Sequence, residues 1–195
     1  RKYNKSFPYF NFLHEKNFIK IIKNNKQKLI KLDENMERIH NKEKYIFSFD
    51  DSLKDHVFAT NELEKNNILG QFFINTLPII DKKILGVHKL HLMFGKYESS
   101  ELIKTVIKYE DFSLKNVKIP TYKKYQLKNS LDKDHATKLK LKIFLNEKKN
   151  VLLVNKIFNF FFSKSQQKKI LNEFYLNEDD VINIDKKGMI IGGHS

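Results

Sequence analysis

The sequence predicts an α/β fold, in which parallel strands joined by a helix carry a large helical insertion. The run 45–49 is β-branched or aromatic apart from Ser48, and the run 71–75 is also largely apolar. Short apolar runs of this kind are typical of buried strands. The stretch between them has apolar residues at helical spacing. A strand, a helix and a strand within about thirty residues form a βαβ unit with parallel strands.

The composition is that of a folded domain. Of the 195 residues, 41% are hydrophobic and 13% aromatic, which is enough for one domain with a core and an insertion. No apolar run reaches the roughly eighteen residues of a transmembrane helix, and a cytoplasmic location is expected. The absence of cysteine excludes disulfides and thiolate chemistry. Because the chain begins with Arg1, we expect the natural amino terminus to lie upstream.

The net charge of +14 raises the question of an anionic partner. Only Arg1 and Arg38 are arginines, and the lysines are spread over the whole chain. Phosphate and base recognition favour the planar, bidentate guanidinium group. Solvated helix faces therefore explain the charge better than a nucleic-acid site, and no nucleic-acid partner is expected. An acidic polysaccharide or a lipid-linked sugar phosphate would also suit this charge.

Two adjacent carboxylates follow the first predicted strand. Asp50 and Asp51 lie at its carboxyl end, where α/β folds with parallel strands place ligands and catalytic groups. Asn75 would lie at the same edge, at the end of the second strand. The alternative is that one aspartate caps the following helix, which leaves the other unexplained.

Four segments are predicted along the chain. Residues 1–40 form an N-terminal helical segment with one or two amphipathic helices. Residues 41–77 form the βαβ unit, whose helix over about 53–68 ends at Gly70 as a left-handed cap. Residues 78–187 form the helical insertion. Residues 188–195 begin a third strand.

Within the insertion, the stretch 139–145 is ambiguous because four of its apolar residues alternate as in a strand. We assign it to a helix. The stretch 151–162 is apolar on nearly every side and is predicted to be the central helix. The predicted helix caps are Ser99 with Ser100, Ser165, and Asn177 with Asp180.

The last helix is predicted to end at Gly188, and the third strand covers 189–191. It leads into Gly192, Gly193, His194 and Ser195. Glycines beside a histidine suit a place where the backbone approaches a ligand closely.

Asp50, Asp51 and His194 at the ends of adjacent parallel strands would form most of a metal-hydrolase site. Divalent ions take carboxylate oxygen and imidazole nitrogen as ligands. Such an ion lowers the pKa of bound water and polarises a carbonyl, while a second carboxylate removes the proton. Successive residues of a strand face opposite ways, so the two aspartates can divide these roles.

Three motifs resemble, in order, those of the NodB-like polysaccharide deacetylases. They are Phe47-Ser-Phe-Asp50-Asp51, Gly70-Gln-Phe-Phe and Gly188-Met-Ile-Ile-Gly-Gly-His194-Ser195. The insertion, with Asn75-Thr-Leu-Pro and Val87-His-Lys-Leu-His91, is similar to the WbmS-type branch found in surface-polysaccharide gene clusters. The resemblance covers about residues 45–195.

The resemblance implies a partial (β/α) barrel of the polysaccharide deacetylase type. It also implies a metal-dependent hydrolase that removes N-acetyl groups from a sugar in capsule or lipopolysaccharide biosynthesis. Asp50 would be the general base, and Asp51 and His194 would be ligands of a divalent metal, with zinc expected. Asn75, His88 and His91 are the candidates for substrate contact.

The sequence departs from the family pattern in two ways. Ser52 replaces the usual glycine and would be strained if that position needs a positive φ. The second histidine ligand and the later motifs are expected beyond Ser195. A catalytically inactive relative that binds a glycan is therefore the alternative function.

The remaining histidines allow other interpretations. His88 and His91, spaced i and i+3 on a predicted helix, could instead share a metal. His56 and His135 lie among charged residues and are expected to be solvated.

Overall fold

The computed structural model describes residues 13–34, 43–120 and 134–194. These fall into two compact units. The first comprises the described residues of 12–84 and of 168–195, and the second those of 85–167. Among the described residues, no helix is long and apolar enough to cross a membrane.

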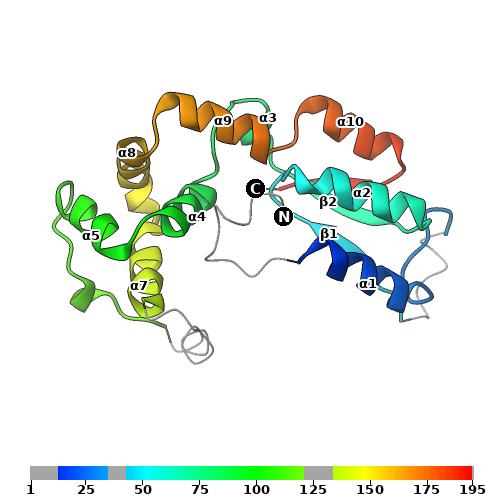
Figure 1. The fold of residues 1–195 in the computed structure, drawn as a ribbon, viewed down its shortest axis with the longest axis horizontal. Coiled ribbons are helices and arrows are strands. Elements are labelled where there is room, and N and C mark those ends of the chain that lie inside the picture. Colours follow the sequence, from blue (N-terminus) through cyan, green and yellow to red (C-terminus); the bar gives the residue numbers. More distant parts are fainter. Residues whose placement is uncertain (1–12, 35–42, 121–133, 195) are drawn as a thin grey trace. The chain divides into compact units, whose positions relative to one another are not determined.

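The first unit contains a parallel sheet (Figure 1). Strands β1 (Phe47–Phe49), β2 (Gly70–Ile74) and β3 (Ile190–Gly193) pair in the order β1-β2-β3. Both pairs are parallel, with Phe47 opposite Gly70 and Gln71 opposite Ile190. The α/β class and the parallel βαβ unit are therefore confirmed.

Strand β1 is less buried than predicted, because it lies at an edge of the sheet. Phe47 and Phe49 are half-buried and Ser48 is exposed. The ring of Phe18, in helix α1 (Glu15–Asn25), covers this strand, with centroids 5.1 Å from Phe47 and 6.0 Å from Phe49.

The N-terminal segment has one helix in its described part. After α1 the chain runs alongside the sheet, where Ile30 N donates to Tyr45 O and Leu69 N donates to Ile30 O. Of the one or two amphipathic helices predicted, the described part therefore contains one, and Leu29 and Leu32 lie outside it. These backbone groups are bonded to distant segments rather than to their own helical turn.

Helix α2 (Asp55–Lys65) ends differently from the prediction. The left-handed residue after it is Asn67, with φ of 54°, whereas Gly70 is the first residue of β2. A Cβ atom on Gly70 would lie 2.6 Å from Cδ1 of Leu63. Glycine is thus present for close packing between strand and helix, and not as a helix cap.

The core of the first unit joins both ends of the chain. Helix α10 (Glu178–Lys186) contacts α2, and it contributes Ile184 to a cluster with the sheet. The short helix α3 (Thr76–Ile79) follows β2. The cluster includes Ile22, Leu63, Ile68, Phe72, Ile184 and Met189.

The second unit is helical in its described residues. It contains α4 (Gly86–Lys96), α5 (Ser99–Ile107), α7 (His135–Leu145) and α8 (Val151–Phe161), with 3₁₀ turns at Leu114–Asn116 and Lys148–Asn150. Helix α9 (Lys164–Phe174) begins in this unit and ends in the first. The helix assignments of the ambiguous stretch and of the apolar stretch are confirmed. Helix α8 nevertheless exposes one face, since Leu152 is 73% exposed.

Two predicted features at helix ends are confirmed. Asn177 and Asp180 form a capping box at the start of α10, and Gly188 has φ of 75°. Strand β3 begins one residue later than predicted and runs on to Gly193.

Two other predicted caps are wrong. Glu98 rather than a serine caps α5, in a capping box with Glu101. The turn before α9 uses Ser163, whose Oγ accepts from Gln166 N, rather than Ser165. In each case the residue that caps the helix lies one or two positions before the predicted serine.

Candidate functional site

The carboxyl edge of the sheet brings Asp51 and His194 together. Asp51 follows β1, and His194 follows β3. His194 N donates to Ile74 O at 2.9 Å, which extends the β2–β3 pairing by one residue. The His194 Nδ1 atom then lies 3.8 Å from Asp51 Oδ1.

This pair is not a hydrogen bond, because 3.8 Å exceeds the usual limit for one. The His194 Nδ1 atom is shielded from solvent and has no hydrogen-bond partner among the described residues. The rest of the ring is not shielded, since the side chain as a whole is 34% exposed. Buried polar atoms in proteins normally have a partner. The geometry therefore leaves His194 Nδ1 as a buried polar atom without a hydrogen bond to any described residue, beside the Asp51 carboxylate.

The chemistry of the Asp51 carboxylate and the His194 imidazole suits a divalent metal, but only in part. Carboxylate oxygen and imidazole nitrogen are both zinc ligands, and two ligands of one tetrahedral zinc lie roughly 3.4 Å apart. The separation of 3.8 Å between Asp51 and His194 is close to this value. In the described part of the chain, no three His, Asp or Glu side chains form a group that could hold a metal. The described residues therefore supply two ligands, whereas a catalytic zinc site usually has three from protein.

A turn, rather than the strand, directs the two aspartates. Strand β1 ends at Phe49, Asp50 is exposed just beyond it, and Asp51 and Ser52 have φ of 71° and 56°. The alternation of side chains along a strand, which was expected to direct the two aspartates to opposite faces, therefore does not apply to them. Asp51 instead lies in a turn, where it and Ser52 are two successive left-handed residues.

Neither aspartate caps the next helix. The residue at the N-cap of α2 is Lys54, which makes no side-chain capping bond, and the acidic residue in the first turn is Asp55. The capping explanation for Asp50 and Asp51 is therefore excluded for this helix.

The condition stated for Ser52 is met, since its φ is 56°. Its side chain is fully buried. Its Oγ atom bonds the backbone of Asn75, accepting from N at 2.7 Å and donating to O at 3.1 Å. Sequence reasoning anticipated the backbone conformation and missed these bonds.

Asn75 has a structural role at this edge. Its Oδ1 atom accepts from Leu77 N at 3.1 Å and caps α3. The signal was present in the sequence, because Asn followed by Pro78 in the first turn is a helix-start pattern.

His88 and His91 lie in α4 of the second unit. They are 5% and 9% exposed, and their ring centroids are 6.0 Å apart. Lys142 Nζ, from α7, lies 3.3 Å from Nε2 of His91. Because an ammonium group can only donate, this nitrogen is an acceptor and its lone pair is already used.

His56 is not solvated as predicted. It is 6% exposed, with its ring centroid 5.5 Å from that of Phe49 and 5.8 Å from that of Phe72. Its charged neighbours in sequence do not keep it in solvent, because the imidazole packs against the rings of two strands. The side chains of His135 and Ser195 lie outside the described residues.

A small cavity lies near this edge but does not reach the Asp51–His194 pair. Its volume is about 160 Å³, below the roughly 300 Å³ at which ligand pockets begin. Phe49 and Leu53, on either side of the aspartate turn, contribute to its wall together with residues of α1 and α2.

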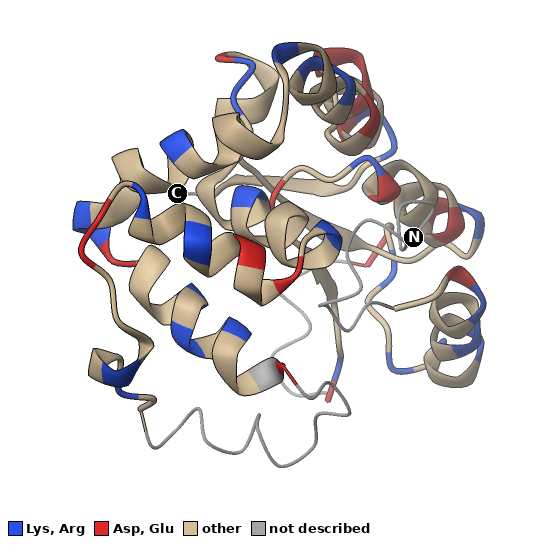
Figure 2. Ribbon diagram, turned by 60° about the vertical axis from the view of Figure 1, so that its left-hand side comes forward, with Lys and Arg blue, Asp and Glu red and all other residues tan. Residues whose placement is uncertain are grey.

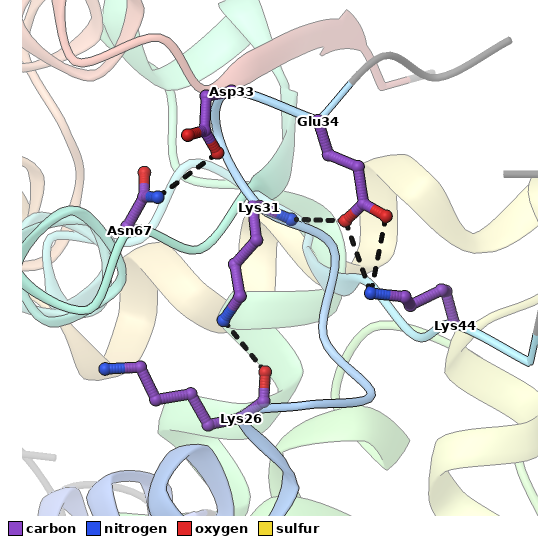
Figure 3. Close-up of polar contacts among 6 residues, drawn as sticks. All are labelled: Lys26, Lys31, Asp33, Glu34, Lys44 and Asn67. Carbon is purple, nitrogen blue, oxygen red and sulfur yellow. Dashed lines mark hydrogen bonds and ion pairs between the residues drawn. The ribbon is translucent and has the colours of Figure 1, made fainter. Parts of the chain in front are cut away.

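A second polar cluster joins the loop after α1 to two other segments (Figure 3). Lys31 Nζ donates to Lys26 O at 2.8 Å, and Glu34 accepts from Lys31 N and pairs with Lys44. Burial lowers the pKa of Lys31, and the charges of Lys26 and Lys44 lower it further, while Glu34 opposes them. The contacts indicate a structural cluster, because the bonds drawn in Figure 3 all join the six residues shown to one another.

No family model, curated protein or solved structure matches this chain.

Proposed function

We propose that this chain carries a metal-dependent deacetylase site that removes N-acetyl groups from a sugar in surface-polysaccharide biosynthesis. The fold would be a partial (β/α) barrel of the polysaccharide deacetylase type. The observation that carries the proposal is the pairing of Asp51 Oδ1 with the unbonded His194 Nδ1 at the carboxyl edge of parallel strands.

The residues of the edge suit amide hydrolysis. A divalent ion, with zinc expected, would polarise the acetyl carbonyl and lower the pKa of a water molecule. Asp51 would hold the ion through Oδ1, and His194 through Nδ1. Asp50, exposed and next to Asp51, would accept the proton of the attacking water. Water would add to the carbonyl carbon and the C–N bond would break, with the proton taken up by Asp50 passing to the leaving nitrogen, so that acetate and a free amine would result.

The charge distribution supports an anionic substrate, such as an acidic polysaccharide or a lipid-linked sugar phosphate. Residues 85–167 contain 17 lysines and 7 acidic residues, which gives +10 of the total of +14. Figure 2 shows lysines on several helices. Such a surface attracts polyanions at long range and in a salt-dependent manner.

The test is a calorimetric zinc titration of the 195-residue chain and its variants. We expect weak binding, because two donors are available, and loss of binding in Asp51→Asn and in His194→Ala. His88→Ala is the control and should bind as the wild type does. Zinc binding that survives both site variants would overturn the proposal. A greater loss in His88→Ala or His91→Ala than in His194→Ala would place the metal in α4.

Activity is measured as acetate released from a short oligomer of N-acetylglucosamine by the zinc-saturated chain. Release that requires Asp50 supports the enzyme. Binding of the oligomer without release, in a chain that does hold zinc, favours the inactive glycan-binding relative.

A further inference from the structure

The last residue of β2 and the residue after it bind both segments that carry the candidate ligands. On one side, His194 N donates to Ile74 O at 2.9 Å. On the other side, Ser52 Oγ bonds both the N and the O atoms of Asn75. The segments that carry Asp51 and His194 are therefore both bonded to one short stretch, Ile74 at the end of the central strand and Asn75 next to it.

Ser52 lies where a residue of β1 would pair with Asn75 if that strand continued in the same register. The register of β1 with β2 stops at Phe49 opposite Phe72, so β1 offers no backbone partner to Asn75. The Ser52 hydroxyl accepts from the Asn75 amide at 2.7 Å and donates to its carbonyl at 3.1 Å. One side chain thus satisfies both backbone groups at the point where the chain leaves the strand.

The Ser52 backbone makes a third connection. Its carbonyl accepts from Leu176 N at 2.8 Å, and Lys54 N donates to Phe174 O at 2.9 Å. The turn is therefore held against β2 by the side chain and against the segment before α10 by the backbone. These bonds hold Ser52 in a left-handed conformation that residues with a Cβ atom disfavour.

We propose that Ser52 is a positioning residue, whose Oγ holds the Asp51 carboxylate beside His194 by tying the aspartate turn to Asn75. A glycine at position 52 would accept the left-handed backbone conformation without strain, but it would remove both hydrogen bonds of the hydroxyl group. Only the consequence of this positioning for catalysis rests on the proposed function. The geometric claim is independent of any metal.

The first test needs no metal and uses NMR. Asp51→Asn should change the ring chemical shifts of His194 in the wild-type background, because the two side chains are neighbours. In Ser52→Ala and Ser52→Gly backgrounds this change should fall by about half or more, as expected for coupled sites. Ser52→Gly covers the case in which Ser52→Ala does not fold, since glycine accepts the left-handed φ.

The matched control is Thr60→Val, which also removes a buried hydroxyl from the first unit. Thr60 Oγ1 donates to His56 O at 2.8 Å, and its residue is 1% exposed. This variant should lower the unfolding temperature and leave the effect of Asp51→Asn on His194 unchanged. An undiminished effect in both folded Ser52 variants would overturn the proposal.

A second test measures zinc affinity by calorimetry in the same variants. Loss of a partner that orients a metal ligand typically costs about 10- to 100-fold in affinity, and we expect this range for Ser52→Ala and Ser52→Gly. Wild-type affinity in folded Ser52→Gly would assign Ser52 a role in stability alone. If the wild type binds no zinc, the proposed function fails, and the NMR cycle still decides the role of Ser52.

Discussion

Asp50 and Asp51 are adjacent in sequence but differ in their surroundings. Asp50 is exposed, whereas Asp51 is half-buried, has φ of 71° and lies 3.8 Å from His194 Nδ1. We expect Asp50→Asn to leave zinc content nearly intact while deacetylation falls by about 10²- to 10⁴-fold, the usual contribution of a general base. Asp51→Asn should lower both. Calorimetric zinc titration measures metal binding, because weakly bound zinc would be lost on gel filtration. Equal loss of zinc binding in the two variants would contradict the assignment.

Lys31 should make stability depend on pH. Burial, and then Lys26 and Lys44, lower its pKa below the ordinary 10.5. Below both values it is charged in the folded and the unfolded chain, and the charge costs the folded state. As the pH rises through the window between the lowered pKa and 10.5, the folded chain loses its proton first, and stability increases.

The variant Lys31→Gln removes this dependence. Compared with it, the wild type should gain free energy of unfolding between neutral pH and 10.5, measured by urea denaturation at several pH values. Lys28→Gln, at an exposed lysine of the same loop, is the control for replacing a lysine. If the free energies of unfolding of the wild type and Lys31→Gln differ by a constant amount over this pH range, the charge of Lys31 does not destabilise the folded chain.

Strand β3 contains two consecutive glycines with different surroundings. A Cβ atom on Gly192 would lie 2.8 Å from Cδ1 of Phe73, its neighbour on β2, whereas one on Gly193 would meet nothing within 4 Å. We expect Gly192→Ala to cost about 1–3 kcal/mol through overpacking. Gly193→Ala should lie within about 0.5 kcal/mol of the wild type. Equal unfolding free energies of the two variants would show that the Phe73 ring moves aside freely.

The helix ends also show where a local sequence pattern predicts the capping residue and where packing decides it instead. Asn67 rather than Gly70 takes the left-handed position after α2, because Gly70 is needed where the strand passes Leu63. Asn is the residue other than glycine that most readily adopts this conformation. The capping box of Asn177 was predictable because all of its partners lie within three residues.

The second unit has a core of its own. Its described helices bury Leu90, Met93, Leu141, Ile157 and Phe158 to 1% exposure or less. We therefore expect residues 85–167, produced alone, to be helical by circular dichroism and to unfold cooperatively on heating.

Two variants of this fragment make the test specific. Met93→Asp places a charge at a position with 0% exposure and should abolish the cooperative transition. Leu152→Asp, at a residue of α8 that is 73% exposed, should leave it unchanged. A fragment that is disordered without these changes would show that the unit requires the rest of the chain.

The sequence by itself determined the α/β class and the order of the strands. Apolar periodicity predicted β1, α2, β2 and most of the helices, because it reflects contacts along one element. It also predicted that Asp51 and His194 would lie at one edge, since parallel strands bring their carboxyl ends together. These inferences need only near neighbours in sequence and a general rule of topology.

Only the tertiary structure decided how that edge is held. Ser52 meets Asn75 across 23 residues, His56 packs on Phe49 and Phe72 of two strands, and His194 reaches Asp51 from the far end of the chain. No local pattern encodes such contacts, because each depends on the register of strands and on which side chain fills the remaining space. The backbone conformation of Ser52, disfavoured locally, persists because these distant partners hold it.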